Sequence, residues 1–184
     1  MPHIPVPAAE LNTRLDRLRC AMTEKDPAWS MLLLDNTLDM YYFTGTMQDG
    51  ALVVTPDQAT LFVRRSFDVA KDESAFADIR PMGSFRGIKE VYPDIPETVY
   101  VAAKTMTLQK LSMLNKHLPF APKPMDGVLS ALRSVKSAYE LDCMRESGKL
   151  HRYVIEGLAP ALLREGVSEA RLCSEICTAI VDRG

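Results

Sequence analysis

The chain has 184 residues, of which 47% are hydrophobic and 25% are charged, and its formal net charge is −2. This length suits one domain, or one domain followed by the start of another, and the composition is that of an ordinary globular protein with a sizeable core. Because nucleic acids and anionic membranes both require a basic face, the near-balanced charge predicts neither kind of partner.

The amino terminus and the cysteines indicate the compartment. Residues 1–7 contain no Lys or Arg and no continuous apolar core, unlike a signal peptide, and the strongest apolar run, Met31 to Leu34, is far too short to span a bilayer. The four cysteines show neither C-x-x-C spacing nor the density of a secreted disulfide framework. They are Cys20, Cys143, Cys173 and Cys177. We expect buried, reduced thiols in a soluble cytoplasmic protein.

The first predicted elements are a helix, a buried strand and a short second helix. Four apolar residues on one stripe predict an amphipathic helix over residues 8–24, which Asp26-Pro27 stops. The apolar run from Trp29 to Leu34 predicts a strand that is buried on both faces. A short helix over residues 38–43 then ends at Gly45.

A β-hairpin follows, with strands over residues 51–55 and 60–64 joined by the turn Pro56–Gln58. Ser66 is expected to cap a helix that runs to about Phe76. The next segment, around Ile79, is expected to form another short strand.

The last part of this region predicts a further strand and a further helix. Residues 84–91 form a short helix or turn, residues 98–102 are apolar and β-branched like a strand, and residues 107–117 form a helix. The apolar stripe of this helix is expected to contain Leu108, Leu111 and Leu114. Prolines 119, 122 and 124 break the pattern. The alternation of strands and helices predicts an α/β layer fold, and the hairpin makes its sheet mixed.

Strand patterns disappear after Gly127, and the rest of the chain is predicted to be helical. Ser137 and Glu140 form a capping box at the start of one helix, Gly157 and Pro160 divide that helix near its end, and Ser168 caps the last one. The change of pattern places a boundary near residues 127–136. We therefore predict an α/β domain over residues 1–130 and an incomplete second domain, opening with a linker and helices, over residues 131–184.

Three stretches resemble the creatinase/prolidase family. Residues 39–45 and the residue after them resemble N-x-x-Y-L-T-G-F. Tyr42, Thr44 and Gly45 match, Asp39 replaces the asparagine, and Thr46 stands where the family usually has an aromatic residue. The hairpin over residues 50–63 is the second stretch. Residues 133–141 resemble the R-x-x-K-[ST]-x-x-E-[IL] signature at which the family passes from its first domain to its second.

The resemblance implies a two-domain enzyme. Its first domain is a mixed sheet flanked by helices, with a ribonuclease-H-like layout. Its second is a pita-bread domain that binds two divalent metal ions (Mn, Co or Zn) through two aspartates, one histidine and two glutamates, and such metals activate a bridging water. These ligands lie beyond the helices of this chain, so we assign no catalytic residue and no metal ligand to it.

The resemblance also implies candidate substrate contacts, because in dimeric relatives the first domain of one subunit reaches the active site of the other. Arg64 and Arg65 close the hairpin, and guanidinium groups bind carboxylates bidentately. The competing interpretation is a solvated strand end or a salt bridge. Tyr42 could line a partner's site in the same way, or could pack in the core. The histidines His3, His117 and His151 are scattered and have no carboxylate partner at metal spacing.

These observations predict the non-catalytic amino-terminal domain of a metal-dependent Xaa-Pro dipeptidase or aminopeptidase. It would contribute to a homodimer and restrict access to the site, and the full-length parent would act on proline-containing peptides. Two alternatives remain: a peptidase-like binding module without activity, and a domain of a creatinase-like amide or amidine hydrolase. The residues that follow Gly184 in the parent would separate the three.

Overall fold

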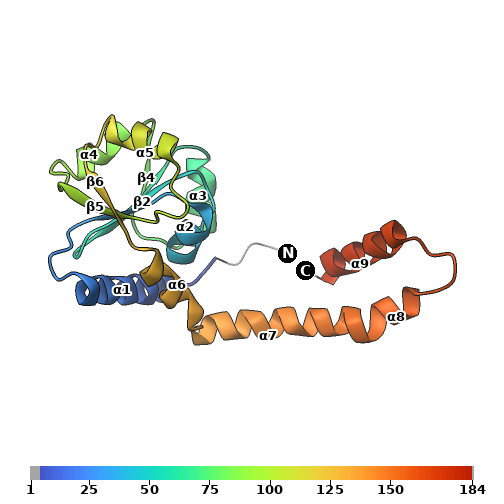
Figure 1. Ribbon diagram of the computed structural model, residues 1–184. Helices are drawn as coiled ribbons and strands as arrows, with labels where there is room; N and C mark the ends of the chain where they lie inside the picture. Colours follow the sequence, from blue (N-terminus) through green and yellow to red (C-terminus); the bar gives the residue numbers. More distant parts are fainter. Residues whose placement is uncertain (1–4, 184) are drawn as a thin grey trace. The chain divides into compact units, whose positions relative to one another are not determined.

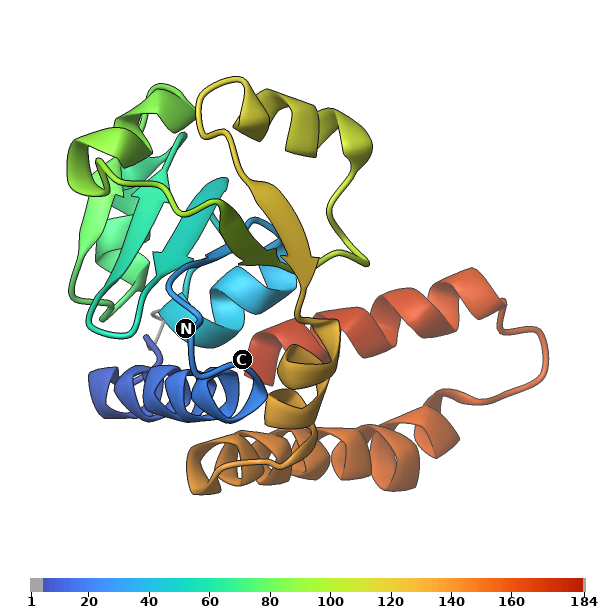
Figure 2. The same ribbon diagram turned by 60° about the vertical axis from the view of Figure 1, so that its left-hand side comes forward.

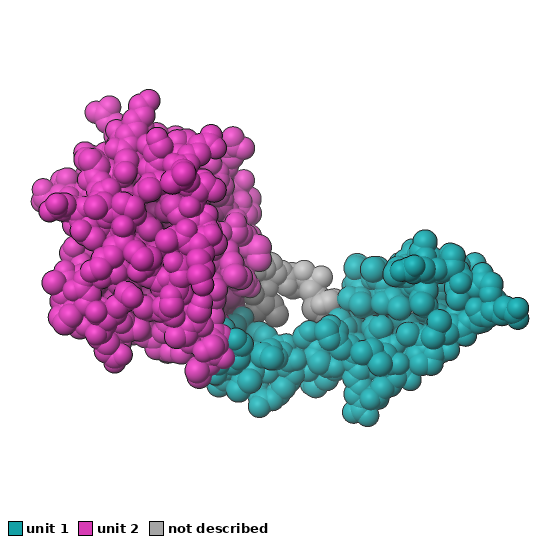
Figure 3. Space-filling model, viewed as in Figure 1, with its two compact units in different colours: residues 1, 136–184 teal, residues 2–135 magenta. Residues whose placement is uncertain are grey.

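The computed structural model describes residues 5–183, and the chain divides into two compact units. One unit covers residues 2–135 and the other covers residues 136–184 (Figure 3). His3 and the first part of the segment 1–7 lie outside the described residues. The first unit contains the sheet, and the second is helical.

The first unit is built on a six-stranded mixed sheet with the order β4-β3-β2-β1-β5-β6 (Figure 1). Its strands are β1 (Leu32–Leu34), β2 (Gly50–Val54), β3 (Ala59–Val63), β4 (Ile79–Pro81), β5 (Thr98–Val101) and β6 (Ala121–Pro124). β2 runs antiparallel to β1 and β3, whereas the pairs β3–β4, β1–β5 and β5–β6 are parallel. Every strand of the described sheet except β2 therefore ends at the same edge.

Helices cover both faces of this sheet. They are α1 (Ala8–Lys25), α2 (Thr37–Thr44), α3 (Phe67–Glu73), the 3₁₀ turn η1 (Phe85–Gly87), α4 (Ile88–Val91), α5 (Leu108–Asn115) and α6 (Asp126–Ser134). α1 packs against α2 and α6. In Figures 1 and 2, α1 and α6 lie on one side of the sheet, and α4 and α5 lie on the other. The predicted α/β fold, a mixed sheet flanked by helices, is confirmed.

The core forms on both faces because the central strands bury every side chain. Leu32, Leu33 and Leu34 in β1 are each 1% exposed or less, which confirms a strand buried on both faces. One buried cluster joins the sheet to η1, α4 and α5, and its members include Met31, Leu33, Val53, Phe62, Val101, Phe85, Ile88 and Leu114. β1 is shorter than predicted, since Trp29 and Met31 are buried but lie outside the strand.

Gly45 and Gly50, one in each of the first two stretches that resemble the family, occupy backbone positions that other residues would disturb. Gly45 ends α2 with a φ of 76°, a left-handed conformation that favours glycine, and its N–H donates to the Tyr41 carbonyl. Gly50 opens β2 so close to its partner strand that an added Cβ would lie 2.0 Å from the Phe62 carbonyl oxygen. A side chain at position 50 would force the hairpin strands apart.

Three local predictions in the first unit are wrong. Ser66 precedes α3 but has a left-handed φ of 58° and makes no side-chain capping bond, and the helix ends at Glu73 rather than near Phe76. Leu108 is 86% exposed, because it occupies the first turn of α5, while Leu114 is fully buried. The prolines after α5 do not simply break the pattern, since β6 contains two of them.

The second unit consists of helical segments. These are α7 (Ala138–Arg152), the π-helical segment Tyr153–Leu158, α8 (Ala159–Leu162) and α9 (Glu169–Arg183). The predicted capping box is confirmed, because Glu140 N–H donates to the Ser137 hydroxyl at 3.1 Å and Ser137 N–H donates to the Glu140 carboxylate at 2.9 Å. Ser168 caps α9 through the Arg171 N–H at 3.3 Å. None of the described side chains in these four segments is buried.

The four cysteines are free but exposed, so the prediction that they are buried is wrong. Three of them, Cys143, Cys173 and Cys177, lie in the second unit, whose described segments form no buried core to enclose them. Within residues 5–183, no helix combines the length and the apolar character needed to cross a bilayer.

Candidate functional site

Tyr42 lies inside the first unit rather than on its surface. It is 7% exposed, and its hydroxyl donates to the Leu132 carbonyl at 3.3 Å. The guanidinium carbon of Arg14 lies 4.3 Å from the centre of its ring, and Arg14 also donates to the Tyr42 carbonyl at 2.7 Å. Both the ring and the hydroxyl are therefore used within the fold, as the packing interpretation of this residue predicts.

Asp39 joins two of the stretches that carry the family resemblance. Asn36 caps α2 by accepting from the Asp39 N–H at 2.9 Å, and its amide also donates to the Asp39 carboxylate. The same carboxylate, whose side chain is 5% exposed, forms an ion pair with Arg133 of α6. Together with the bond from Tyr42 to Leu132, this pair fixes the last turn of α6. The sequence did not predict the ion pair between Asp39 and Arg133, because the two residues are 94 positions apart.

Arg64 follows β3 directly and is held in a salt bridge. Its Nε and Nη2 donate to Asp49 Oδ2 at 2.8 and 2.6 Å, and its backbone N–H donates to the Asp49 carbonyl. The side chains of this pair are 39% and 41% exposed. Arg64 thus shows the salt bridge named as the competing interpretation, while Arg65 is exposed.

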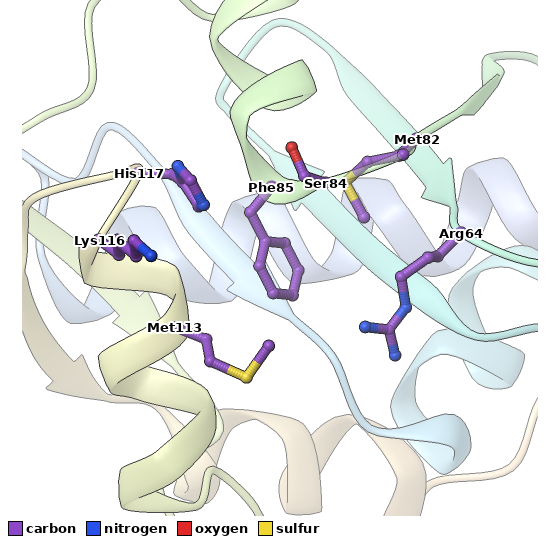
Figure 4. Close-up of a pocket in the computed structure, with 8 residues that line it drawn as sticks. Arg64, Met82, Ser84, Phe85, Met113, Lys116 and His117 are labelled. Carbon is purple, nitrogen blue, oxygen red and sulfur yellow. The ribbon is translucent and has the colours of Figure 1, made fainter.

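Arg64 also borders a hollow at the edge where the parallel strands end (Figure 4). Its volume is about 240 Å³, and its other lining residues come from the segment after β4 and from the end of α5. They are Met82, Gly83, Ser84, Phe85, Met113, Lys116 and His117. Ligands of open α/β sheets commonly bind at such an edge. Tyr42 is absent from this lining, so the hollow does not bring Tyr42 and Arg64 together.

An ion pair with a buried carboxylate, which the sequence did not predict, lies after β1. The side chain of Asp35 is 2% exposed, and the ammonium of Lys110 in α5 lies 2.8 Å from its Oδ2. The same ammonium donates to the Asp35 carbonyl at 2.8 Å. The carboxylate contact is an ion pair without good hydrogen-bond alignment, since neither carboxylate oxygen has an aligned donor. In the sequence, the ion pair is indicated only by the position of Asp35, a charged residue directly after an apolar strand.

Asp26 is the most strongly perturbed acid among the described residues. It follows α1, and its Oδ2 accepts from the Tyr100 hydroxyl at 2.6 Å and from Lys123 at 2.9 Å. These two hydrogen bonds lower the pKa of Asp26 to about 2. The cluster ties the end of α1 to β5 and β6.

Metal ligands are not grouped in the described part of the chain. No cluster of three or more His, Cys, Asp or Glu side chains lies close enough there to hold an ion. The two divalent metals implied by the family resemblance therefore find no fitting donor set among residues 5–183.

A comparison with protein-family models identifies one family. The model of the creatinase/prolidase N-terminal domain matches residues 14–135. No curated protein sequence gives a match.

Solved structures extend the likeness beyond that domain. A Xaa-Pro dipeptidase from Bacillus anthracis is 20% identical with a TM-score of 0.81, covering 95% of this chain and 50% of its own. Dipeptidase PepE from Mycobacterium ulcerans is 26% identical with a TM-score of 0.77, covering 98% and 52%. The chain thus spans about half the length of these two proteins.

A third structure covers the first domain alone. It is the creatinase/prolidase N-terminal domain of an X-Pro dipeptidase from Streptococcus pyogenes, which is 18% identical with a TM-score of 0.54. The match covers 65% of this chain and 98% of that one. From the family match over residues 14–135 and the shared fold, we conclude that this chain belongs to the creatinase/prolidase N-terminal domain family.

Proposed function

We propose that this chain is the non-catalytic amino-terminal part of a metal-dependent Xaa-Pro dipeptidase or aminopeptidase. The observation that carries the proposal is the family match over residues 14–135, extended by the likeness of nearly the whole chain to half of a Xaa-Pro dipeptidase. In the parent, the two divalent ions would be bound by residues outside this chain. Proline-containing peptides would be the substrates.

Dimerisation and control of substrate access are the proposed roles of the chain. The second unit offers apolar surface for association, since large apolar side chains along it are between 39% and 76% exposed. They are Leu141, Met144, Ile155, Leu163 and Val181. Surface of this kind is normally covered by another segment or by a partner. A homodimer of the parent would cover part of this apolar surface.

We propose Arg65 as the first candidate for a substrate contact across such a dimer. It is exposed, whereas Arg64 would first have to exchange Asp49 for the substrate carboxylate. Tyr42 would have to give up its bond to Leu132 and leave a buried position. We therefore rank Arg65 above Arg64, and both above Tyr42, as proposed contacts.

A cytoplasmic location is also proposed. Four exposed, free thiols suit a reducing compartment, because exposed cysteines in an oxidising one tend to pair.

The test uses the full-length parent, loaded with Mn²⁺ and offered Ala-Pro and Ala-Ala at equal concentrations. We expect hydrolysis of Ala-Pro with a clear preference over Ala-Ala. If the metal-loaded, folded parent leaves Ala-Pro intact, the Xaa-Pro peptidase proposal fails, and the binding-module and creatinase-like hydrolase alternatives remain.

A further inference from the structure

The hollow beside Arg64 has an apolar floor. Met82 and Phe85 are 4% and 7% exposed, and Met113 of α5 stands opposite them and is 47% exposed. In Figure 4 the ring of Phe85 and the side chain of Met113 lie side by side across the middle of the hollow. A second hollow of about 230 Å³ shares Arg64, Phe85 and Met113 with the first. The two form an apolar slot along α5.

The ionisable side chains that line the first hollow are basic. The lining of the first hollow contains Arg64, Lys116 and His117 and no carboxylate. Arg64 is already neutralised by Asp49. Figure 4 places Lys116 and His117 at the end of the slot opposite Arg64.

Lys116 and His117 have no acidic partner among the described residues, and neither side chain takes part in the hydrogen bonds or ion pairs found there. Their position after the last turn of α5 explains part of this arrangement, because cations at a helix carboxyl end complement its dipole. The dipole does not explain the apolar floor next to them. An unpaired cationic end beside an apolar floor matches a ligand that has an anionic group at one end of an apolar body.

We propose that this slot binds a small monocarboxylate with a branched aliphatic or aromatic body. The body lies on Phe85 and Met113, and the carboxylate faces Lys116 and His117. A volume of about 240 Å³ equals that of about eight water molecules at roughly 30 Å³ each, so the hollow suits only a small ligand. An α-ammonium group on the ligand would be repelled by the Lys116 ammonium, so the site selects acids without an amine over free amino acids.

This inference does not depend on the proposed peptidase function. Binding is a property of the first unit, whereas peptide hydrolysis is tested on the parent. Failure of one experiment therefore leaves the other unaffected.

The test is a titration of the ¹⁵N-labelled chain, followed by its amide spectrum at constant ionic strength. Three ligands of nearly the same shape are compared: 4-methylpentanoate, its neutral amide, and leucine. We expect saturable shifts in residues 82–85 and 113–117 with a dissociation constant on the order of 1–10 mM for the acid, the range for so small a ligand. The neutral amide and leucine should bind at least fivefold more weakly. Equal affinity of the amide, or shifts that fail to saturate, would overturn the proposal.

Matched substitutions locate the site. Met113→Glu places a carboxylate in the slot, while Met47→Glu changes a methionine that is 60% exposed and is not among the lining residues. We expect Met113→Glu to weaken binding at least tenfold and Met47→Glu to leave it unchanged. Equal affinities of the two variants would contradict the assignment. If Met113→Glu does not give a folded spectrum, Lys116→Gln decides, because its side chain is exposed and its loss should weaken binding about fivefold.

Discussion

Asp26 makes the stability of the first unit depend on pH. Because hydrogen bonds from Tyr100 and Lys123 lower its folded-state pKa to about 2, below the ordinary 3.8, its ionised form stabilises the fold above that ordinary value. The contribution is then lost as pH falls from about 4 through about 2.

We therefore predict that the free energy of unfolding of the wild type falls more steeply than that of Asp26→Asn between pH 4 and pH 2. Above pH 5 the difference between them should be constant. Urea unfolding of both proteins at several pH values measures it. Parallel curves across the acid range would show that Asp26 is not held in this way.

The ion pair between Asp39 and Arg133 is predicted to stabilise the fold because Asp39 is buried. Arg133→Met leaves that carboxylate without its cation and should lower the free energy of unfolding by about 2–3 kcal/mol. The control is Arg145→Met, which breaks a pair whose side chains are 66% and 72% exposed and should cost less than about 1 kcal/mol. Urea unfolding compares the two. Similar losses of unfolding free energy in the two variants would mean that the pair between Asp39 and Arg133 stabilises the fold no more than an exposed pair does.

Residue-level predictions from sequence succeeded where the partners are close in the chain. Ser137 and Glu140 are three positions apart, so a capping box could be read directly from their spacing. The pairs Asp39–Arg133 and Asp35–Lys110 join residues 94 and 75 positions apart, and only the folded chain brings them together. Exposure of the cysteines was also beyond the sequence pattern, since it depends on whether neighbouring segments cover their helices.

At the scale of elements, β6 shows why a proline-rich strand was missed. The N–H groups of Ala121 and Met125 donate to Glu97 and Val101 of the neighbouring segment, while Pro122 and Pro124 occupy alternate positions of this edge strand. Proline is tolerated at edge positions where no ladder donor is needed. The hairpin of β2 and β3, in contrast, was predicted well, because its turn and its apolar residues are adjacent in sequence.

This arrangement predicts a position-dependent effect of proline in β6. Ala121→Pro removes the donor to the Glu97 carbonyl and should cost about 2–3 kcal/mol of unfolding free energy. Pro122→Ala changes a position whose backbone nitrogen faces away from β5, so it should change the free energy of unfolding by less than about 1 kcal/mol. Thermal or urea unfolding distinguishes them. A larger loss of unfolding free energy for Pro122→Ala than for Ala121→Pro would contradict the view that the backbone nitrogen of residue 121 faces β5 and that of residue 122 faces away from it.

At the scale of the whole chain, the two units differ in how much they bury. The first has two central strands, β1 and β2, whose side chains are all buried, whereas none of the described side chains in α7 to α9 is buried. Local stability follows the amount of buried apolar contact.

Amide hydrogen exchange should therefore be faster in α7, α8 and α9 than in β1 and β5. The measurement is made on chain shown to be monomeric by sedimentation, because a dimer would protect the second unit through its apolar surface. Equal protection of both regions in such a monomer would mean that the second unit is stable by itself.

The central claim is that this chain contains no catalytic site of the proposed parent peptidase, and the most direct measurement is a peptidase assay of the purified chain. The chain is incubated with Mn²⁺, Co²⁺ or Zn²⁺ and with Ala-Pro or Gly-Pro, next to the metal alone and to the full-length parent. We predict that the chain releases no more product than the metal alone, while the parent is active. Turnover by the chain that survives repurification would contradict the account.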